Sequence, residues 1–248
     1  MLTKDIRGAT AWLKLDRADK LNAMPRTFWQ ELRDAMSDVE ADDAVRVAVF
    51  HGEGRCFSVG GDIEDFGGIG GVADRRAYMR DALSAFRAVE QMPKPVLAAV
   101  HGHALGGGCE LTMVCDIVVA DETAKFGTPE AAVGLVPGLG VVRGLSHANL
   151  HWMKYMVMTG LSLTAAEAHA AGLVNRVVPP GEHLAEAERL ADVIATRSPL
   201  ALAVGKEILS RGTWDGYQYA VEAIALLQSG EDFAEGISAF VERRRPAF

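Results

Sequence analysis

Strand-like and helix-like hydrophobic patterns alternate over the first 135 residues of this 248-residue chain. In the first pattern, the apolar residues Ala11, Leu13 and Leu15 alternate with their neighbours, which is the two-residue period of a strand. The patterns predict strands over residues 11–15, 45–50, 96–100 and 116–121 and helices over residues 28–39, 79–89 and 111–114. This alternation favours an α/β fold over an all-β fold or a helical bundle, and it also permits a layered, coiled arrangement of short β pairs between helices.

The last hundred residues are predicted to be mostly helical. Thr164 and Glu167 have the spacing of a capping box, and Gly172 is suited to end the short helix that follows. A short strand is expected over residues 173–178, and helical patterns cover residues 182–197, 199–210 and 214–229. No low-complexity linker separates these segments from the rest, so we expect the helical part to pack on the core or on another subunit.

Composition and charge exclude several classes of function. The 25 Lys and Arg residues against 33 Asp and Glu residues give a net charge of −8, which argues against non-specific binding to nucleic acids or anionic membranes. The three cysteines, Cys56, Cys109 and Cys115, are odd in number and show no paired metal-ligand spacing, so we expect buried thiols in a reducing compartment. No apolar run approaches the roughly 18 residues of a membrane span. We therefore expect a soluble, cytoplasmic protein without a bound metal.

The first candidate site lies at residues 104–110, between a predicted strand and a predicted helix. Its three glycines leave backbone N–H groups at the helix start available to a ligand, and the helix dipole adds partial positive charge there. Glu110 stands in the first helical turn and can project into the same space. A tight turn followed by a carboxylate that the dipole favours explains the same residues without a function.

Two further candidates lie at residues 56–63 and 126–130. The first contains two glycines and an aspartate at 60–62, which form a turn or helix start with more available N–H groups. On local grounds an ordinary surface turn explains this segment better. In the second, Thr128 is suited to cap a helix, and the proline and Glu130 that follow are typical of its first turn, so capping alone explains the pattern.

Familiar catalytic motifs are missing or lack their context. Residues 68–73 match a relaxed dinucleotide-binding pattern, but no strand is predicted before them. The segment around Ser58 has Cys56 where a nucleophile elbow needs its first glycine. There is no Walker loop or zinc-protease motif, and the seven histidines form no convincing ligand cluster.

Taken in order, the candidate segments resemble those of the enoyl-CoA hydratase (crotonase) family. The matching stretches are residues 20–24, 57–63, 98–110, 115–116, 126–130, 134–138, 159–160, 170–174 and 240–248. The likeness runs nearly from end to end, and although no single motif decides it, the ordered set is highly specific.

The resemblance implies a fold and an assembly. The family fold is a crotonase-like α/β spiral of ββα repeats with a C-terminal helical trimerisation region. We therefore expect residues 1–190 to form the spiral core with the active site, and residues 191–248 to form the helical oligomerisation region. The expected partners are an acyl-CoA thioester substrate and further copies of the chain, as a homotrimer or a dimer of trimers. No cofactor is expected, because coenzyme A is part of the substrate.

The resemblance also implies which groups react. By matching position, the backbone N–H groups of Gly61 and Gly107 would stabilise negative charge on the thioester oxygen, as in an oxyanion hole. Glu110 and Glu130 match the two glutamates that flank the double bond in hydratases of the family. The likeness favours Glu130 as the donor of a proton to Cα and Glu110 as the group that activates water, although the sequence does not fix which is acid and which is base.

Six further positions match substrate-binding residues of the family, and these are Lys20, Ala23, Gly60, Asp62, Ile63 and Arg243. The basic pair, Lys20 and Arg243, are candidates to contact the CoA phosphates, although Arg243 also belongs to a terminal run of charge that solvation explains equally. The positions that line the CoA channel do so mainly through backbone atoms. Two departures stand out, since Glu64 occupies a place where many relatives have lysine, and residues 140–149 replace a family motif that borders the acyl pocket.

The expected activity is that of an enoyl-CoA hydratase, which adds water across a trans-2-enoyl-CoA to give a 3-hydroxyacyl-CoA. One alternative is a Δ3,Δ2-enoyl-CoA isomerase, in which Glu130 moves a proton and Glu110 takes no part. The other is a non-catalytic acyl-CoA-binding protein. The presence of both glutamates favours hydration, because one can suffice for isomerisation and a binding protein needs neither.

Overall fold

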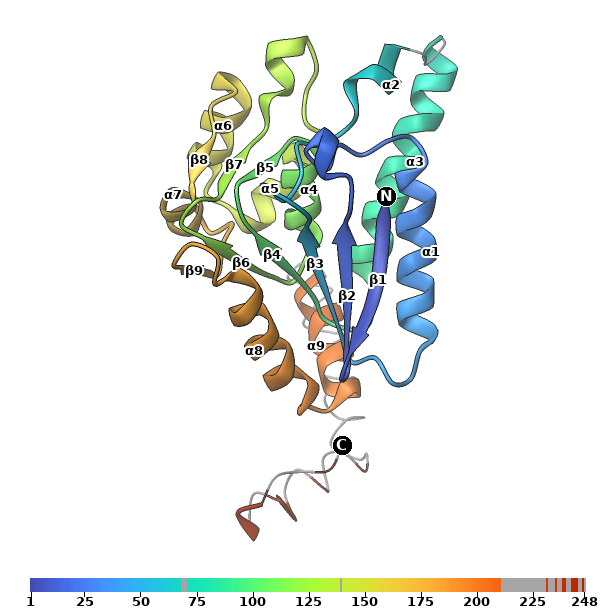
Figure 1. The fold of residues 1–248 in the computed structure, drawn as a ribbon, viewed down its shortest axis with the longest axis vertical. Coiled ribbons are helices and arrows are strands. Elements are labelled where there is room, and N and C mark those ends of the chain that lie inside the picture. The colour runs from blue at the N-terminus through green and yellow to red at the C-terminus, as the bar shows by residue number, and fades with distance from the viewer. Residues whose placement is uncertain are drawn as a thin grey trace.

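A six-stranded sheet forms the centre of the protein in the computed structural model, which describes residues 1–67, 71–138 and 140–210 and, beyond them, residues 231, 235, 238–239, 242–244 and 247. The strands pair in the order β1 (Leu2–Arg7), β2 (Thr10–Leu15), β3 (Val47–Gly52), β4 (Val96–Val100), β6 (Ile117–Asp121) and β9 (Arg176–Val178). β1 and β2 are antiparallel, and the other neighbours are parallel (Figure 1). Parallel neighbours need crossover connections, and these contain helices, which confirms the predicted α/β class.

The protein also contains a second, smaller sheet of three short strands among the described residues. It consists of β5 (His103–Leu105), β7 (Lys125–Gly127) and β8 (Leu163–Thr164), with β5 and β7 parallel and β8 antiparallel to β7. β5 begins three residues after β4 ends, and β7 begins four residues after β6 ends. A long strand is thus followed by a short one and then by a helix. This is the ββα repeat that the sequence resemblance implies.

Helices cover both faces of the large sheet. In chain order they are η1 (Ala18–Lys20), α1 (Phe28–Ala41), α2 (Ile63–Gly67), α3 (Val72–Gln91), α4 (Gly107–Val114), η2 (Pro129–Val133), α5 (Gly140–His147), α6 (Leu150–Thr159), α7 (Ala165–Ala171), α8 (His183–Ala195) and α9 (Pro199–Ser210), where η denotes a 3-10 helix. None of these helices is long and apolar enough to span a bilayer.

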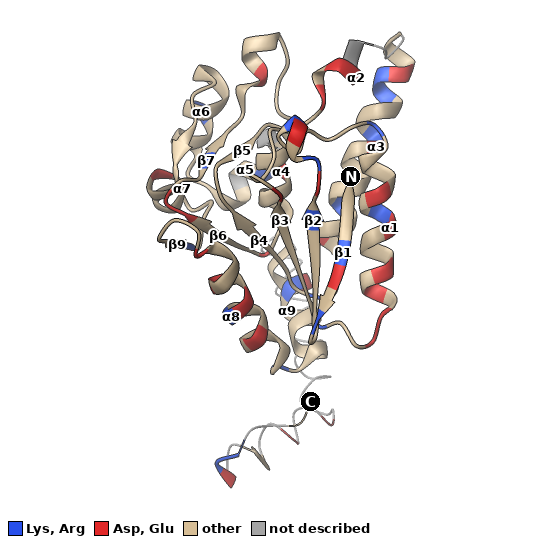
Figure 2. Ribbon diagram, viewed as in Figure 1, with Lys and Arg blue, Asp and Glu red and all other residues tan. Residues whose placement is uncertain are grey.

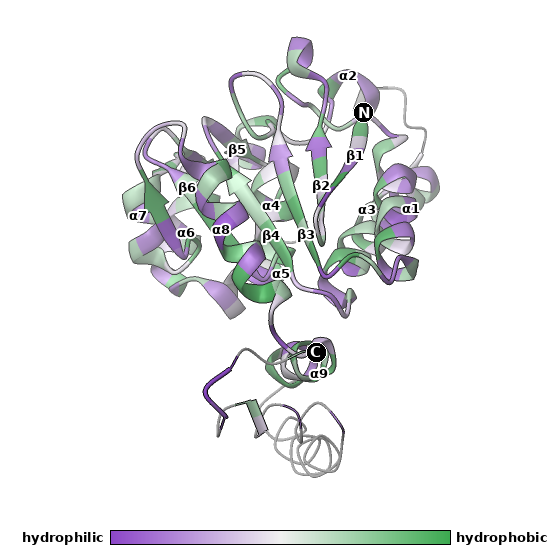
Figure 3. Cartoon of the chain, turned by 60° about the horizontal axis from the view of Figure 1, so that its bottom comes forward, coloured by the Kyte–Doolittle hydropathy of each residue, from purple (hydrophilic) through white to green (hydrophobic). Residues whose placement is uncertain are grey.

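The hydrophobic core is divided by the sheet. On one side α1 and α3 lie next to each other and bury apolar residues such as Phe28 and Phe86 (Figure 1). On the other side Trp12 and Val49 pack against Ala187 of α8. β3 and β4 contain no charged residue, whereas α1 and α8 contain charged residues that are all exposed or half-buried (Figures 2 and 3). Burial on both faces explains why these strands have continuous apolar runs instead of alternating patterns.

The expected division between the core and the oligomerisation region lies within a helix. The division between residues 190 and 191 falls inside α8, because both Ala187 and Ala191 pack on the sheet. The division into a core and an oligomerisation region stays a prediction, as does the helix expected over residues 214–229, which lies outside the described residues.

The capping box is confirmed. Thr164 Oγ1 accepts a hydrogen bond from the Glu167 N–H at 3.2 Å, Glu167 Oε2 accepts one from the Thr164 N–H at 2.8 Å, and Gly172 ends α7 at φ +91°.

Candidate active site

The start of α4 presents a backbone amide that its own helix does not use. β5 leads through Gly106, at φ +51°, directly into Gly107, the first residue of the helix. The amide of Gly106 donates to the carbonyl of Gly127 at 2.9 Å, which ties this turn to β7. The first N–H groups of a helix have no intrahelical acceptor. The Gly107 N–H is therefore available at the positive end of the helix dipole.

The segment Gly60–Gly61 lies directly against this helix start. A Cβ atom on Gly60 would stand 2.7 Å from the Leu105 carbonyl oxygen and 2.8 Å from the Gly107 nitrogen. Gly60 also has φ +91°, so both space and backbone conformation require glycine there. A Cβ atom on Gly107 would lie 3.6 Å from the Gly61 nitrogen. The structure thus brings the two predicted amides together.

The N–H of Gly61 is also left available. Gly61 forms a parallel bridge with Met24, in which the Met24 amide donates to the Gly60 carbonyl at 2.8 Å and the Asp62 amide donates to the Met24 carbonyl at 2.9 Å. Because peptide groups alternate in direction along an extended segment, the Gly61 N–H points away from Met24. Within the described part of the chain, neither the Gly61 nor the Gly107 amide donates to a protein acceptor. Two adjacent amides of this kind suit one partly negative oxygen.

The two glutamates come from different elements and interact electrostatically. Glu110 belongs to the first turn of α4 and is 8% exposed, and its Oε1 lies 3.9 Å from the position that a Cβ on Gly138 would take. Glu130 belongs to η2, and its Oε1 lies 3.1 Å from the Cβ position of Gly106. The charge of Glu110 raises the pKa of Glu130, so the two carboxyl groups are close enough to interact.

Burial makes Glu130 suited to carry a proton near neutral pH. Loss of hydration, reinforced by the charge of Glu110, raises the pKa of Glu130 to about 7, although its own backbone N–H opposes the rise. Its Oε2 is buried and has no hydrogen-bond partner among the described residues. A carboxyl group with such a pKa can be protonated or ionised at physiological pH, as acid–base catalysis requires.

The expectation that Thr128 caps a helix is wrong. Thr128 occupies the position before η2, but its side chain makes no capping hydrogen bond, and its buried Oγ1 has no partner in the described part of the chain. Pro129 does begin η2, as predicted. Capping by Thr128 therefore does not account for this segment.

The predicted CoA-binding residues are only partly gathered at the site. Lys20 is exposed and forms an ion pair at 3.2 Å with Glu64, so this departure from the family supplies the lysine with a competing partner. Ile63 is exposed at the start of α2. Arg243 is exposed as well, and the described C-terminal residues, red in Figure 1, lie at the bottom of that view, whereas α2 lies at its top. The structure does not bring Arg243 to the site of its own chain.

Asp62 and Ala23 have a structural partner that the sequence interpretation missed. Arg17 Nη1 donates to Asp62 Oδ2 at 2.7 Å and to the Ala23 carbonyl at 3.0 Å. This ion pair lowers the pKa of Asp62. Asp62 is 8% exposed, so its carboxylate is used within the protein. A basic residue shortly before the segment at 20–24 was the only signal for this contact.

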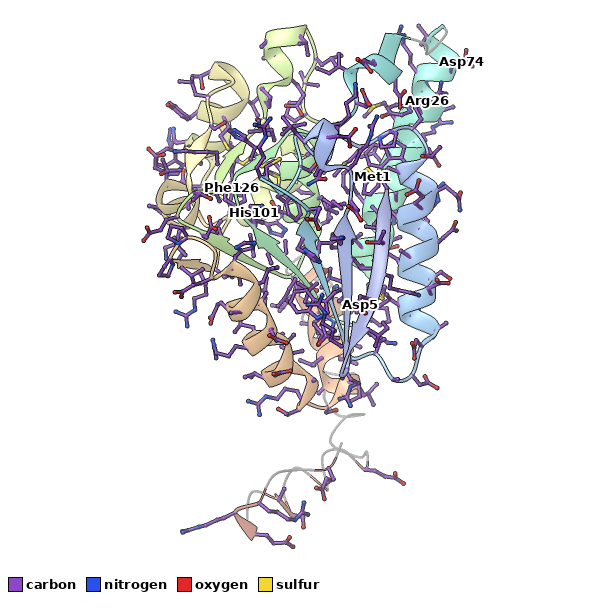
Figure 4. All side chains as sticks on the ribbon, viewed as in Figure 1. Met1, Asp5, Arg26, Asp74, His101 and Phe126 are labelled. Carbon is purple, nitrogen blue, oxygen red and sulfur yellow. The ribbon has the colours of Figure 1, made fainter. Side chains whose placement is uncertain are left out.

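The departure at residues 140–149 is attached to α3. Arg143 of α5 forms an ion pair with Glu90 near the end of α3. Phe126 of β7, labelled in Figure 4, is fully buried. Met79 belongs to α3, whose first turn contains the Asp74 labelled in Figure 4. Its Cε lies 3.1 Å from the Cβ position of Gly138. Met79 and Glu110 are therefore both close to Gly138.

The chain shares its fold and its sequence pattern with a known class of enzymes. A family model described as enoyl-CoA hydratase/isomerase matches residues 5–248. A probable enoyl-CoA hydratase of Rhizobium meliloti is 38% identical over 253 residues, covering 100% of this chain and 97% of the relative. A crotonyl-CoA hydratase of Syntrophomonas wolfei is 35% identical and covers 96% and 94% of the two chains.

Solved structures agree with the sequence comparison. An enoyl-CoA hydratase from Bacillus anthracis superposes with a TM-score of 0.94 at 29% identity, covering 100% of this chain and 98% of that one. The chain belongs to the enoyl-CoA hydratase/isomerase family, and the predicted crotonase fold is confirmed.

Proposed function

We propose that the protein is an enoyl-CoA hydratase that converts a trans-2-enoyl-CoA to a 3-hydroxyacyl-CoA. The observation that carries this proposal is the convergence of two available backbone amides, Gly61 and Gly107, with two interacting carboxyl groups, Glu110 and Glu130. The names of the relatives support the same reaction. Hydration requires one group to take a proton from water and another to give a proton to Cα, and the site supplies a carboxyl group for each task.

The proposed reaction begins with the thioester oxygen bound by the amides of Gly61 and Gly107. Glu110 accepts a proton from water as the water oxygen bonds to Cβ of the substrate. The electrons of the double bond move toward the thioester carbonyl, where the two amides stabilise the enolate oxygen. Protonated Glu130 then donates its proton to Cα. Loss of a proton from Glu110 and uptake of one by Glu130 restore the starting state.

Coenzyme A binding is proposed from the family resemblance, through Lys20, Ala23, Gly60, Asp62, Ile63 and Arg243. The Lys20–Glu64 ion pair must open or shift for the lysine to contact a phosphate. Arg243 would have to act on the site of a neighbouring subunit, which fits the proposed homotrimer or dimer of trimers. Absence of a cofactor and a cytoplasmic location are further parts of the proposal.

Hydration of crotonyl-CoA, followed by loss of enoyl absorbance, tests the proposal. We expect turnover by the wild type and a loss of about 1,000-fold in Glu110→Gln, because the amide cannot accept the proton of water. Glu188→Gln removes the same charge from an exposed position on α8 and should retain full activity. A 3-enoyl-CoA is assayed in parallel. Full hydratase activity in Glu110→Gln, or isomerisation without hydration in the wild type, would contradict the proposal.

A further inference from the structure

Ser58 connects three segments of the site and is fully buried. Its backbone N–H donates to the His103 carbonyl at 2.9 Å, and its carbonyl accepts from the Leu105 N–H at 2.9 Å. Its hydroxyl donates to the Asn22 carbonyl at 2.8 Å and accepts from the Gly60 N–H at 3.1 Å. Ser58 is thus bonded to Gly60, next to the Gly61 amide, and to β5, which leads to the Gly107 amide.

The hydroxyl of Ser58 fixes the conformation of Gly60. The Gly60 N–H is satisfied by Ser58 Oγ, and the Gly60 carbonyl accepts from Met24, so both backbone polar groups of Gly60 are held. Asn22, the partner of the hydroxyl proton, is itself held in the left-handed region at φ +57°. Its Nδ2 donates to three carbonyl groups, those of Glu53, Cys56 and Phe57. The Ser58 hydroxyl therefore links the Asn22 carbonyl to the Gly60 N–H. Gly60 directly precedes the Gly61 amide.

The backbone of Ser58 fixes the other amide. The paired bonds to His103 and Leu105 attach β5, which ends directly before Gly106 and α4. A Cβ atom on Gly108 would lie only 2.5 Å from the Ser58 carbonyl oxygen, so the first turn of α4 is in direct contact with Ser58. The relative positions of the Gly61 and Gly107 amides thus depend on the same residue.

We propose that Ser58 is a positioning residue that sets the spacing of the two amides around the substrate oxygen. This inference rests on the proposed function of those amides. The hydroxyl uses its proton on Asn22 and a lone pair on Gly60, so its role is to orient and not to attack. Without it, the buried Gly60 N–H loses its acceptor, and the segment can relax by rotating the peptide that carries the Gly61 N–H.

The direct test measures polarisation of a bound carbonyl in Ser58→Ala. The probe is butyryl-CoA labelled with 13C at the thioester carbon, which is saturated and cannot be hydrated. We expect its 13C resonance to move downfield on binding to the wild type, because two amides polarise the carbonyl. In Ser58→Ala we expect about half of that displacement or less. Ser198→Ala is the matched control, because Ser198 is also a buried serine that accepts a backbone N–H, that of Ala201, and lies beside α9.

Kinetics of crotonyl-CoA hydration give the second readout. We expect Ser58→Ala to lower kcat by about 10- to 100-fold with KM changed less than about threefold, since a donor displaced by about 1 Å loses transition-state stabilisation more than binding. Ser198→Ala should retain the kcat of the wild type at a similar loss of thermal stability. If Ser58→Ala does not fold, Ser58→Cys replaces it, because a thiol is a weaker donor and should give intermediate values for both readouts.

The outcomes separate the two proposals. A Ser58 variant with the carbonyl displacement and kcat of the wild type would overturn the positioning role even if the enzyme is a hydratase. A wild type that polarises butyryl-CoA but hydrates no enoyl-CoA would overturn the proposed function, and the carbonyl displacement would still test Ser58. A wild type that binds butyryl-CoA without displacing the resonance would overturn the positioning role as well.

Discussion

The two halves of the candidate site are built on different principles. The amide half, around Gly60–Gly61 and Gly106–Gly107, is fixed by backbone hydrogen bonds and by contacts that leave no room for a Cβ atom at Gly60. The carboxyl half consists of Glu110 and Glu130 and depends on burial and on the interaction of two charges. The first half is rigid and does not titrate, whereas the second is tuned by its surroundings. Oxyanion stabilisation benefits from the former, and proton transfer from the latter.

The carboxyl half should give the largest effect. Glu130→Gln keeps size and polarity but removes the transferable proton, so we expect kcat for hydration to fall by about 1,000-fold, within the range of general acid–base catalysis. Butyryl-CoA should still show its carbonyl displacement, because both amides remain. A variant that loses the displacement as well as kcat would show that the two halves are not separable.

The amide half can be broken at Gly107. Proline is tolerated at the first position of a helix, so Gly107→Pro removes the N–H without interrupting α4. Loss of one oxyanion donor predicts a fall of about 100- to 1,000-fold in kcat. Gly107→Ala is the control, since it keeps the amide and its Cβ would meet neighbours only at 3.6 Å. Equal activity of the two variants would exclude this amide from catalysis.

A glycine-to-alanine substitution should destabilise the protein more in the amide half, at Gly60, than beside the carboxyl half, at Gly138, which lies next to Glu110. In Gly60→Ala the Cβ atom meets backbone at 2.7 Å and the residue is held at φ +91°, so we expect a loss of about 2 kcal/mol or more in the free energy of unfolding. In Gly138→Ala the nearest atom, at 3.1 Å, is the flexible end of Met79, which can move. We expect less than about 0.5 kcal/mol there, measured by urea unfolding. Equal losses of unfolding free energy would contradict the expected difference between a contact with backbone at Gly60 and a contact with a flexible side chain at Gly138.

Some strands of the fold could be predicted from the sequence, and others could not. Long apolar runs gave β3 and β4, and the glycine and glutamate positions followed from the family resemblance. β1 was missed because it is an exposed edge strand, whose residues Leu2–Arg7 are largely polar. β5 and β7 were missed because three residues are too few to establish a period.

Contacts between distant segments were beyond the reach of sequence patterns. The bridge between Ser58 and Ala104, the ion pair of Arg17 with Asp62 and the competition of Glu64 for Lys20 each join residues far apart in the chain. Local periodicity contains no information on such pairs. The elevated pKa of Glu130 is equally non-local, because it arises from loss of hydration in the folded chain and from the charge of Glu110 on α4.

The pH dependence of hydration offers the most graded test of the comparison. Glu130 must be protonated to donate to Cα, and burial raises its pKa to about 7. Below pH 7 most of Glu130 is protonated, and above pH 7 the protonated fraction falls about tenfold per pH unit, which kcat/KM reports. Gly107→Pro should lower the whole profile and keep its bend near pH 7, because the amide does not titrate. Ser198→Ala should leave both height and bend unchanged. A bend that moves in Gly107→Pro, or a wild-type kcat/KM that stays constant from pH 6 to pH 9, would assign the proton donor to another group.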